Sequence, residues 1–118
     1  MSLTSQKGDV GEVYDDGYLY LEHDRFYLSF GGKPLYKISR TDFKILSRLL
    51  RSPGRPVTGR EIWQSMRGRE AEYNGSSLRV HLTYLRHKLA PYGVNIVHEA
   101  GSGYLVRVAP PTKVETTD

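Results

Sequence analysis

Four leucines near the end of the chain constrain its fold more than any other feature. They recur at three- and four-residue intervals as Leu78, Leu82, Leu85 and Leu89. This spacing places side chains on one face of an α-helix, so it predicts a helix over residues 76–90 that packs its leucine face against other elements. Asn74, Ser76 or Ser77 can cap its start, and Pro91 with Gly93 ends it.

Two more helix starts precede this segment. Thr58 and Glu61 have the spacing of a capping box, and Ser39 with Asp42 forms an acidic variant of it. We therefore expect helices over residues 39–51 and 58–66, separated by the helix-stopping residues 52–54. The apolar residues expected in the core of the three helices are Phe43, Leu46, Leu49, Leu50, Ile62, Trp63, Met66, Leu78, Leu82, Leu85 and Leu89.

Short β-rich segments flank the helices. Residues 18–22, 25–30 and 34–38 are expected strands, with Gly31-Gly32 forming a tight hairpin turn. The sequence VNIVHEAGSGYLVRV predicts a second hairpin after the last helix. The expected fold class is thus α+β, with an antiparallel sheet, a three-helix core and a terminal hairpin. We expect residues 1–16 to be a linker or disordered start, 17–109 the domain, and 110–118 a disordered tail.

The composition narrows the classes of function. A length of 118 residues suits one domain, and the sequence has no cysteine, which excludes disulfides and thiolate metal sites. No signal peptide or membrane-spanning segment is apparent, so a cytoplasmic location is expected. Residues 1–30 carry two basic and six acidic side chains, whereas residues 31–118 carry fifteen basic and seven acidic ones. A basic body on a small domain suggests a polyanionic partner, most often nucleic acid.

The expected outer face of helix 76–90 has an unusual composition for a solvated surface. Arg79, Thr83 and His87 form one row, and Val80 with Tyr84 lies beside it. Such faces ordinarily mix glutamate and lysine, but this segment contains no acidic residue. A helix in the major groove of DNA needs cations for phosphates at its borders, and donors with apolar surface for base edges on its face. The residues that lie at the borders of the leucine face and can contact phosphates are His81, Arg86 and Lys88.

Three stretches resemble one protein family in sequence and in spacing. ISRTDFKILSRLLRSPGRPVTGREIW, LRVHLTYLRHKL and GSGYLV follow each other as in the winged-helix DNA-binding domain of OmpR/PhoB-type response regulators. The resemblance covers about residues 18–108. It implies a winged helix-turn-helix whose terminal hairpin is the wing. It also implies sequence-specific binding to double-stranded promoter DNA, usually as tandem dimers on direct repeats, in the phosphorelay of a two-component system.

The resemblance also assigns expected roles to individual residues. Ser76, His81, Thr83 and Arg86 match phosphate-facing positions of the family, and Ser77 matches a further DNA-contacting position. The positions that match base-facing residues of the family are Arg79, Val80 and Tyr84. Residues 67–75 match a loop that touches RNA polymerase in some members.

The chain also departs from the family pattern. Thr83 and Tyr84 stand where arginine is common, and Ala100 stands where the wing often carries arginine. Because an arginine in the wing enters the narrow minor groove of A·T-rich DNA, the wing contact of this chain is in question. The length leaves no room for a receiver domain. We therefore expect an excised output domain, with residues 1–16 as the former linker, rather than a stand-alone regulator.

Other functions were weighed against DNA binding. His81 and His87 are six residues apart, which separates them on the helix, and the sequence GSG lacks the pattern of a nucleophile elbow. We therefore expect no catalysis, no metal and no cofactor. The serious alternative is a winged helix used for protein–protein contact, favoured by Tyr84 and by the missing wing arginine.

Overall fold

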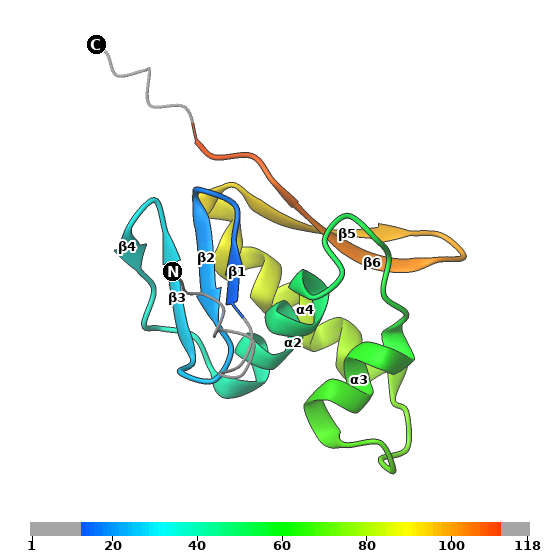
Figure 1. Cartoon of the computed structure of the whole chain (residues 1–118). Coiled ribbons are helices and arrows are strands. Elements are labelled where there is room, and N and C mark those ends of the chain that lie inside the picture. Colours follow the sequence, from blue (N-terminus) through cyan, green and yellow to red (C-terminus); the bar gives the residue numbers. More distant parts are fainter. Residues whose placement is uncertain (1–12, 112–118) are drawn as a thin grey trace.

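The computed structural model describes residues 13–111, which form two sheets around three helices (Figure 1). The first sheet is antiparallel with the order β1-β2-β3-β4, and β5 pairs with β6 in a separate hairpin that projects away from it. In chain order the elements are β1 (Val13–Asp15), β2 (Leu19–Glu22), β3 (Tyr27–Phe30), β4 (Lys33–Pro34), α2 (Arg40–Leu50), α3 (Gly59–Arg67), α4 (Gly75–Leu89), the 3-10 turn η1 (Ala90–Tyr92), β5 (Val94–Glu99) and β6 (Gly103–Val108).

The core lies between the first sheet, the helices and the base of the hairpin. The sheet contributes Leu19, Leu21, Leu28 and Phe30, all at most 3% exposed. The four leucines of α4 are at most 1% exposed, so its leucine face is the buried one, as predicted. All eleven apolar residues expected in the helical core are buried, which confirms the three-helix prediction.

The helix starts follow the predicted capping pattern with one exception. Thr58 and Glu61 form the full capping box at the start of α3, and Asn74 caps α4. The Ser39 hydroxyl accepts a hydrogen bond from the Asp42 backbone N–H at 3.0 Å. The Asp42 carboxylate, however, binds Lys88 of α4 instead of completing a capping box.

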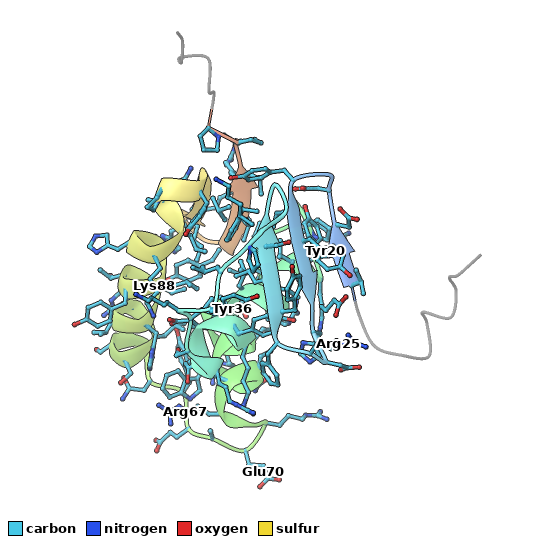
Figure 2. The ribbon with its side chains drawn as sticks, turned by 90° about the vertical axis from the view of Figure 1, so that its left-hand side faces the viewer. Tyr20, Arg25, Tyr36, Arg67, Glu70 and Lys88 are labelled. Atoms are coloured by element: carbon cyan, nitrogen blue, oxygen red, sulfur yellow. The ribbon has the colours of Figure 1, made fainter. Side chains whose placement is uncertain are left out.

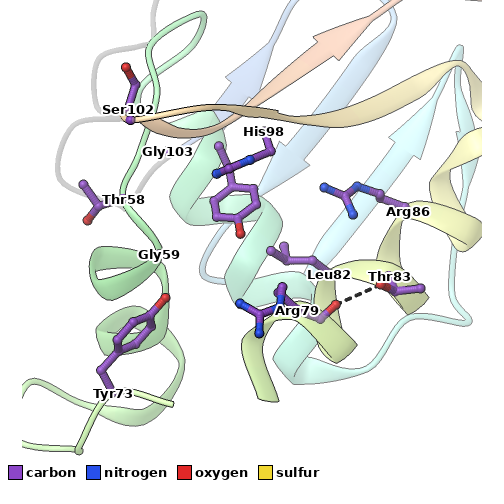
Figure 3. A pocket seen from close by; sticks show the side chains of 12 residues that line it. Thr58, Gly59, Tyr73, Arg79, Leu82, Thr83, Arg86, His98, Ser102 and Gly103 are labelled. Atoms are coloured by element: carbon purple, nitrogen blue, oxygen red, sulfur yellow. Dashed lines mark hydrogen bonds between the residues drawn. The ribbon is translucent and has the colours of Figure 1, made fainter. Parts of the chain in front are cut away.

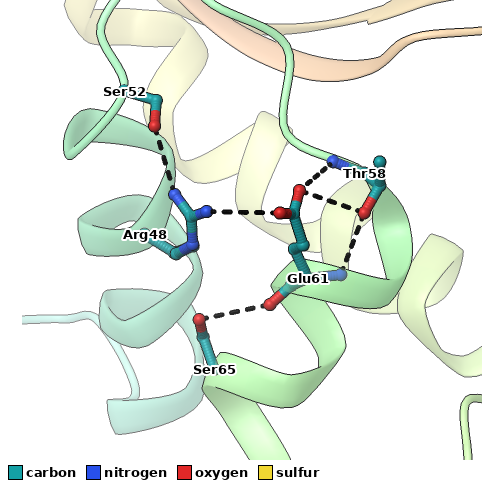
Figure 4. A network of polar contacts seen from close by, with 5 residues as sticks. All are labelled: Arg48, Ser52, Thr58, Glu61 and Ser65. Atoms are coloured by element: carbon teal, nitrogen blue, oxygen red, sulfur yellow. Dashed lines mark hydrogen bonds and ion pairs between the residues drawn. The ribbon is translucent and has the colours of Figure 1, made fainter.

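A polar network joins the end of α2 to the start of α3 (Figure 4). Arg48 donates a hydrogen bond to Ser52 and lies 3.8 Å from the Glu61 carboxylate. The backbone N–H of Thr58 donates to Glu61 at 3.1 Å. This hydrogen bond, with that of the Thr58 hydroxyl, lowers the pKa of Glu61 against a small opposing effect of burial.

The first sheet differs from the prediction at both edges. Residues 13–15, expected within the linker, form β1 and pair with β2. The strand expected over 34–38 is reduced to the two residues of β4, because the chain turns away toward α2. The Gly31-Gly32 turn is confirmed, with φ of 57° and 85° joining Phe30 to Lys33. The rest of the expected linker and residues 112–118 of the expected tail lie outside the described residues.

The hairpin β5–β6 is held near its turn by a backbone contact that was not predicted. The N–H of Val57 donates to the Tyr104 carbonyl, and the N–H of Tyr104 donates to the Val57 carbonyl, both at 2.8 Å. A Cβ at Gly103 would clash with the Val57 backbone, and the φ of Gly103 is 134°. Glycine at 103 therefore lets the hairpin approach the start of α3.

Candidate nucleic-acid interface

The face of α4 opposite its leucines is open to solvent. Arg79, Thr83 and His87 are exposed, and the side chains of Val80 and Tyr84 are 54% and 63% exposed. Two large apolar side chains one helical turn apart, left uncovered beside an arginine, make this face unlike an ordinary solvated surface. Among the other sequence-predicted residues of α4, Ser76 is exposed, whereas Ser77 and His81 are half-buried.

Thr83 is exposed but its hydroxyl already has an acceptor. It donates to the Arg79 carbonyl of its own helix at 2.9 Å, a common arrangement for threonine within helices. Since the residue is exposed, its hydroxyl oxygen can still accept a hydrogen bond and its methyl group can still make an apolar contact. Thr83 thus presents an acceptor and an apolar group, and must give up its helical bond to donate to a phosphate.

Arg86 joins α4 to the hairpin. Its Nε donates to the Ile96 carbonyl of β5 at 2.9 Å, and the side chain is half-buried. This bond uses one of the five guanidinium donors and orients the rest into the space between α4 and the hairpin (Figure 3). Arg86 therefore braces the hairpin in addition to the phosphate-facing role expected from the sequence.

Lys88 is paired inside the protein. Its ammonium Nζ lies 2.6 Å from Oδ2 of Asp42, whose side chain is 6% exposed. The helix itself carries no acidic residue, but α2 supplies the carboxylate that pairs with Lys88, which sequence patterns within the helix do not reveal. Lys88 lies on the side of α4 shown in Figure 2.

A groove of about 540 Å³ separates α4 from the hairpin and the start of α3 (Figure 3). Its cations are Arg79 and Arg86, and no carboxylate lines it. His98 of β5 faces the groove with its ring 4.7 Å from that of Tyr104. Tyr73 lines the opposite end. The periodicity of the third helix could not place Tyr73 and His98 in this groove, because both residues lie outside that helix.

The turn of the hairpin presents little positive charge. Ala100 is exposed at this turn, as its position in the sequence suggests. Across residues 94–108 the single Lys or Arg is Arg107, and it lies 3.8 Å from Glu99 on the paired strand. The hairpin therefore offers no unpaired guanidinium at its turn.

The loop between α3 and α4 is anchored at one end and open at the other. The indole N–H of Trp63 donates to the Glu72 carbonyl at 2.8 Å, and the Arg67 guanidinium lies over the Trp63 ring at 5.3 Å. Arg67 and Glu70 lie at the lower end of the molecule in Figure 2, away from the first sheet. The expected polymerase-contacting loop is thus a protruding surface that Trp63 ties to α3.

Comparison with known proteins shows which family has this fold and this helix arrangement. The family described as "Transcriptional regulatory protein, C terminal" matches residues 32–106. Response regulator MprA of Mycolicibacterium vanbaalenii is 32% identical over 83 residues, which are 69% of this chain and 36% of the relative. The chain thus spans about a third of the length of the curated relatives it matches.

Solved structures agree with the family match. The DNA-binding domain of CpxR from E. coli is 25% identical with a TM-score of 0.67, covering 84% of this chain and 99% of that domain. The RstA DNA-binding domain of Klebsiella pneumoniae, solved in complex with the RstA box, has the same fold at 24% identity and a TM-score of 0.67, covering 80% and 95%. The chain belongs to the family of C-terminal DNA-binding domains of OmpR/PhoB-type transcriptional regulators, with β5–β6 as its wing.

Proposed function

We propose that this chain binds double-stranded promoter DNA sequence-specifically, with α4 in the major groove. The observation that carries the proposal is the exposed face of α4, where Val80 and Tyr84 stand uncovered beside Arg79 and next to a groove without carboxylates. An α-helix with this face matches the width of the major groove and offers donors together with apolar contact for thymine methyl groups.

The geometry supports a division of roles within the site. We assign base reading to Arg79, Val80 and Tyr84, which are all exposed on the face of α4 opposite its leucines. We assign backbone contacts to Ser76 and Ser77 near the start of the helix, to His81 at its border and to Thr83 on its outer face. The free donors of Arg86 add a further backbone contact. Lys88 contributes to DNA binding by holding α4 on the core, since its ammonium already pairs with the Asp42 carboxylate.

The proposal extends to the regulatory setting. The relatives are response regulators, so we propose that the chain performs the DNA-binding output step of a two-component phosphorelay in the cytoplasm, binding adjacent repeats as a tandem dimer. We further propose that loop 67–75 contacts RNA polymerase.

Among the described residues no helix is long and apolar enough to cross a membrane, and no three His, Cys, Asp or Glu side chains are placed to hold a metal ion. Binding, rather than catalysis, is the proposed activity.

The test begins with selection of bound sites from random duplexes. Wild type, Arg79→Ala and Arg86→Ala are then titrated on the selected site and on a scrambled duplex at several salt concentrations. Arg79→Ala should lose ~1–3 kcal/mol, mainly on the selected site. Arg86→Ala should weaken both duplexes and reduce the log–log salt slope by about 1.

Arg25→Ala is the matched control. Arg25 lies on the side of the molecule away from α4 in Figure 2 and is 80% exposed. Removing its charge should leave both affinities nearly unchanged. Equal losses for Arg79→Ala on selected and scrambled DNA would contradict base reading by α4.

Protein–protein contact remains the second candidate. Tyr84 and Tyr36, 63% and 79% exposed, favour it, because exposed tyrosines anchor interfaces as readily as they stack on bases. The salt series separates the two functions, since only phosphate contacts release condensed counterions in proportion to their number. Duplex binding that is absent at low salt would favour the protein partner.

A further inference from the structure

The tip of the Tyr73 side chain lies between the first residues of two helices, and both of these residues are glycines. A Cβ built on Gly59, the first residue of α3, would lie closer to the Tyr73 hydroxyl than real Cβ contacts allow. A Cβ on Gly75, the first residue of α4, would lie 3.3 Å from the same oxygen. Glycine at 59 therefore makes the space that the hydroxyl occupies.

The ring of Tyr73 is held in this place by its neighbours. The Trp63 ring meets it edge-on at 6.3 Å between centroids, and the Arg60 guanidinium lies 5.0 Å from its centroid. The bond from Trp63 to the Glu72 carbonyl fixes the backbone immediately before Tyr73. The hydroxyl is thus carried on a rigid support rather than on a free side chain.

Nothing within the described part of the protein accepts a hydrogen bond from this hydroxyl. It lines the groove that also contains Arg79 and Arg86 (Figure 3). A phenylalanine would fill the apolar part of this space equally well. Because no side-chain polar atom of the described residues is both buried and unpaired, this hydroxyl is open to solvent and free to donate at the edge of a basic groove. An anionic oxygen is the acceptor that such a groove attracts.

We infer that Tyr73 is a DNA-contacting residue whose hydroxyl donates a hydrogen bond to a backbone phosphate, and that Gly59 is required for this placement. The inference rests on the proposed function. It adds a contact outside α4, at the junction of α3 and α4. Because the phosphodiester backbone is the same in every sequence, the contact strengthens binding to all duplexes and positions α4 without reading bases.

The first test is titration of Tyr73→Phe on the selected and scrambled duplexes. Loss of one hydrogen bond should weaken both by about 3- to 10-fold. The log–log salt slope should stay as in wild type, because a neutral hydroxyl displaces no counterion. Tyr36→Phe, which removes a hydroxyl from a tyrosine outside the groove, is the matched control and should bind as wild type does.

The second test uses the contact with Gly59. Gly59→Ala should weaken binding at least as much as Tyr73→Phe, because the new methyl group displaces the hydroxyl. In the Tyr73→Phe background the nearest atoms are Leu78 Cδ2 at 3.2 Å and the ring Cζ at 3.4 Å, so Gly59→Ala should add little further loss. The two losses are therefore non-additive.

The outcomes separate the two proposals. If wild type binds duplexes and Tyr73→Phe binds them equally well, the phosphate contact is overturned but the proposed function stands. Additive losses in the double variant overturn the role of Gly59 in placing the hydroxyl. Wild type without salt-dependent duplex binding overturns the proposed function, and the phosphate contact with it. Thermal melts of each variant distinguish lost binding from lost folding.

Discussion

At the scale of single residues, the pair of Asp42 and Lys88 shows how the interface is supported from behind. The Asp42 carboxylate is buried where α2 meets α4, and the Lys88 ammonium binds it at 2.6 Å. Taking a carboxylate out of water is costly unless a cation and hydrogen bonds replace the water. Lys88 thus stabilises the position of α4 on the core, although its sequence neighbours suggest a phosphate contact.

Lys88→Met should therefore destabilise the fold. Removing the cation leaves a buried carboxylate unpaired, and we expect the free energy of unfolding to fall by ~1–3 kcal/mol, reduced from the fully buried case because Lys88 is partly exposed. Urea unfolding measures this. Asp42→Asn combined with Lys88→Met should recover much of the loss. A salt slope for DNA binding that drops by about 1 in Lys88→Met would instead show that Lys88 reaches a phosphate.

At the scale of elements, local patterns predicted the helices well because the relevant forces are local. Capping side chains and the four-leucine stripe act within one or two helical turns, and each expected helix appears within a residue or so of its predicted ends. The outward face of α4 followed from the same periodicity. These features needed no knowledge of distant residues.

Contacts between distant segments were not predictable in this way. β1 has three residues and lies at an edge of the sheet, so it is too short to show an alternation of apolar and polar residues. The bridge from Val57 to Tyr104 and the bond from Arg86 to Ile96 join segments that only the tertiary fold brings together. Tyr73 was missed for the same reason, since its partner Gly59 is distant in sequence.

The capping box of α3 should give a pH-dependent contribution to stability. The pKa of Glu61 is lowered in the fold, so its stabilising effect is present above its unfolded value and is lost as pH falls through the lowered native value. The melting temperature of Glu61→Ala should therefore lie below that of wild type at neutral pH, and the gap should close as the pH falls below the lowered native pKa of Glu61. Glu70→Ala, in the exposed loop, is the control. A gap independent of pH would contradict the assignment.

At the scale of the whole molecule, the charge and the wing together set how one copy engages DNA. Residues 13–30 of the first sheet carry four carboxylates and one arginine, whereas the groove beside α4 carries arginines without carboxylates. The field therefore orients the domain with α4 toward a polyanion. The wing adds little positive charge to this field, because Arg107 is paired with Glu99 and the turn carries Ala100. Useful affinity should then depend on a second copy on an adjacent repeat, which makes its own binding effectively intramolecular.

Ala100→Arg tests this account of the wing. Ala100 is exposed at the turn between β5 and β6, so an arginine there fits without disturbing the core. The variant should bind more tightly than wild type, most of all when the DNA facing the wing is an A·T tract, whose narrow minor groove attracts arginine. Titrations on duplexes that differ only in this flank measure the effect, and Ala100→Gln controls for side-chain length without charge. If the arginine gains nothing on either flank, the wing does not approach the minor groove. The exposed face of α4 would then be better explained as a surface for a protein partner.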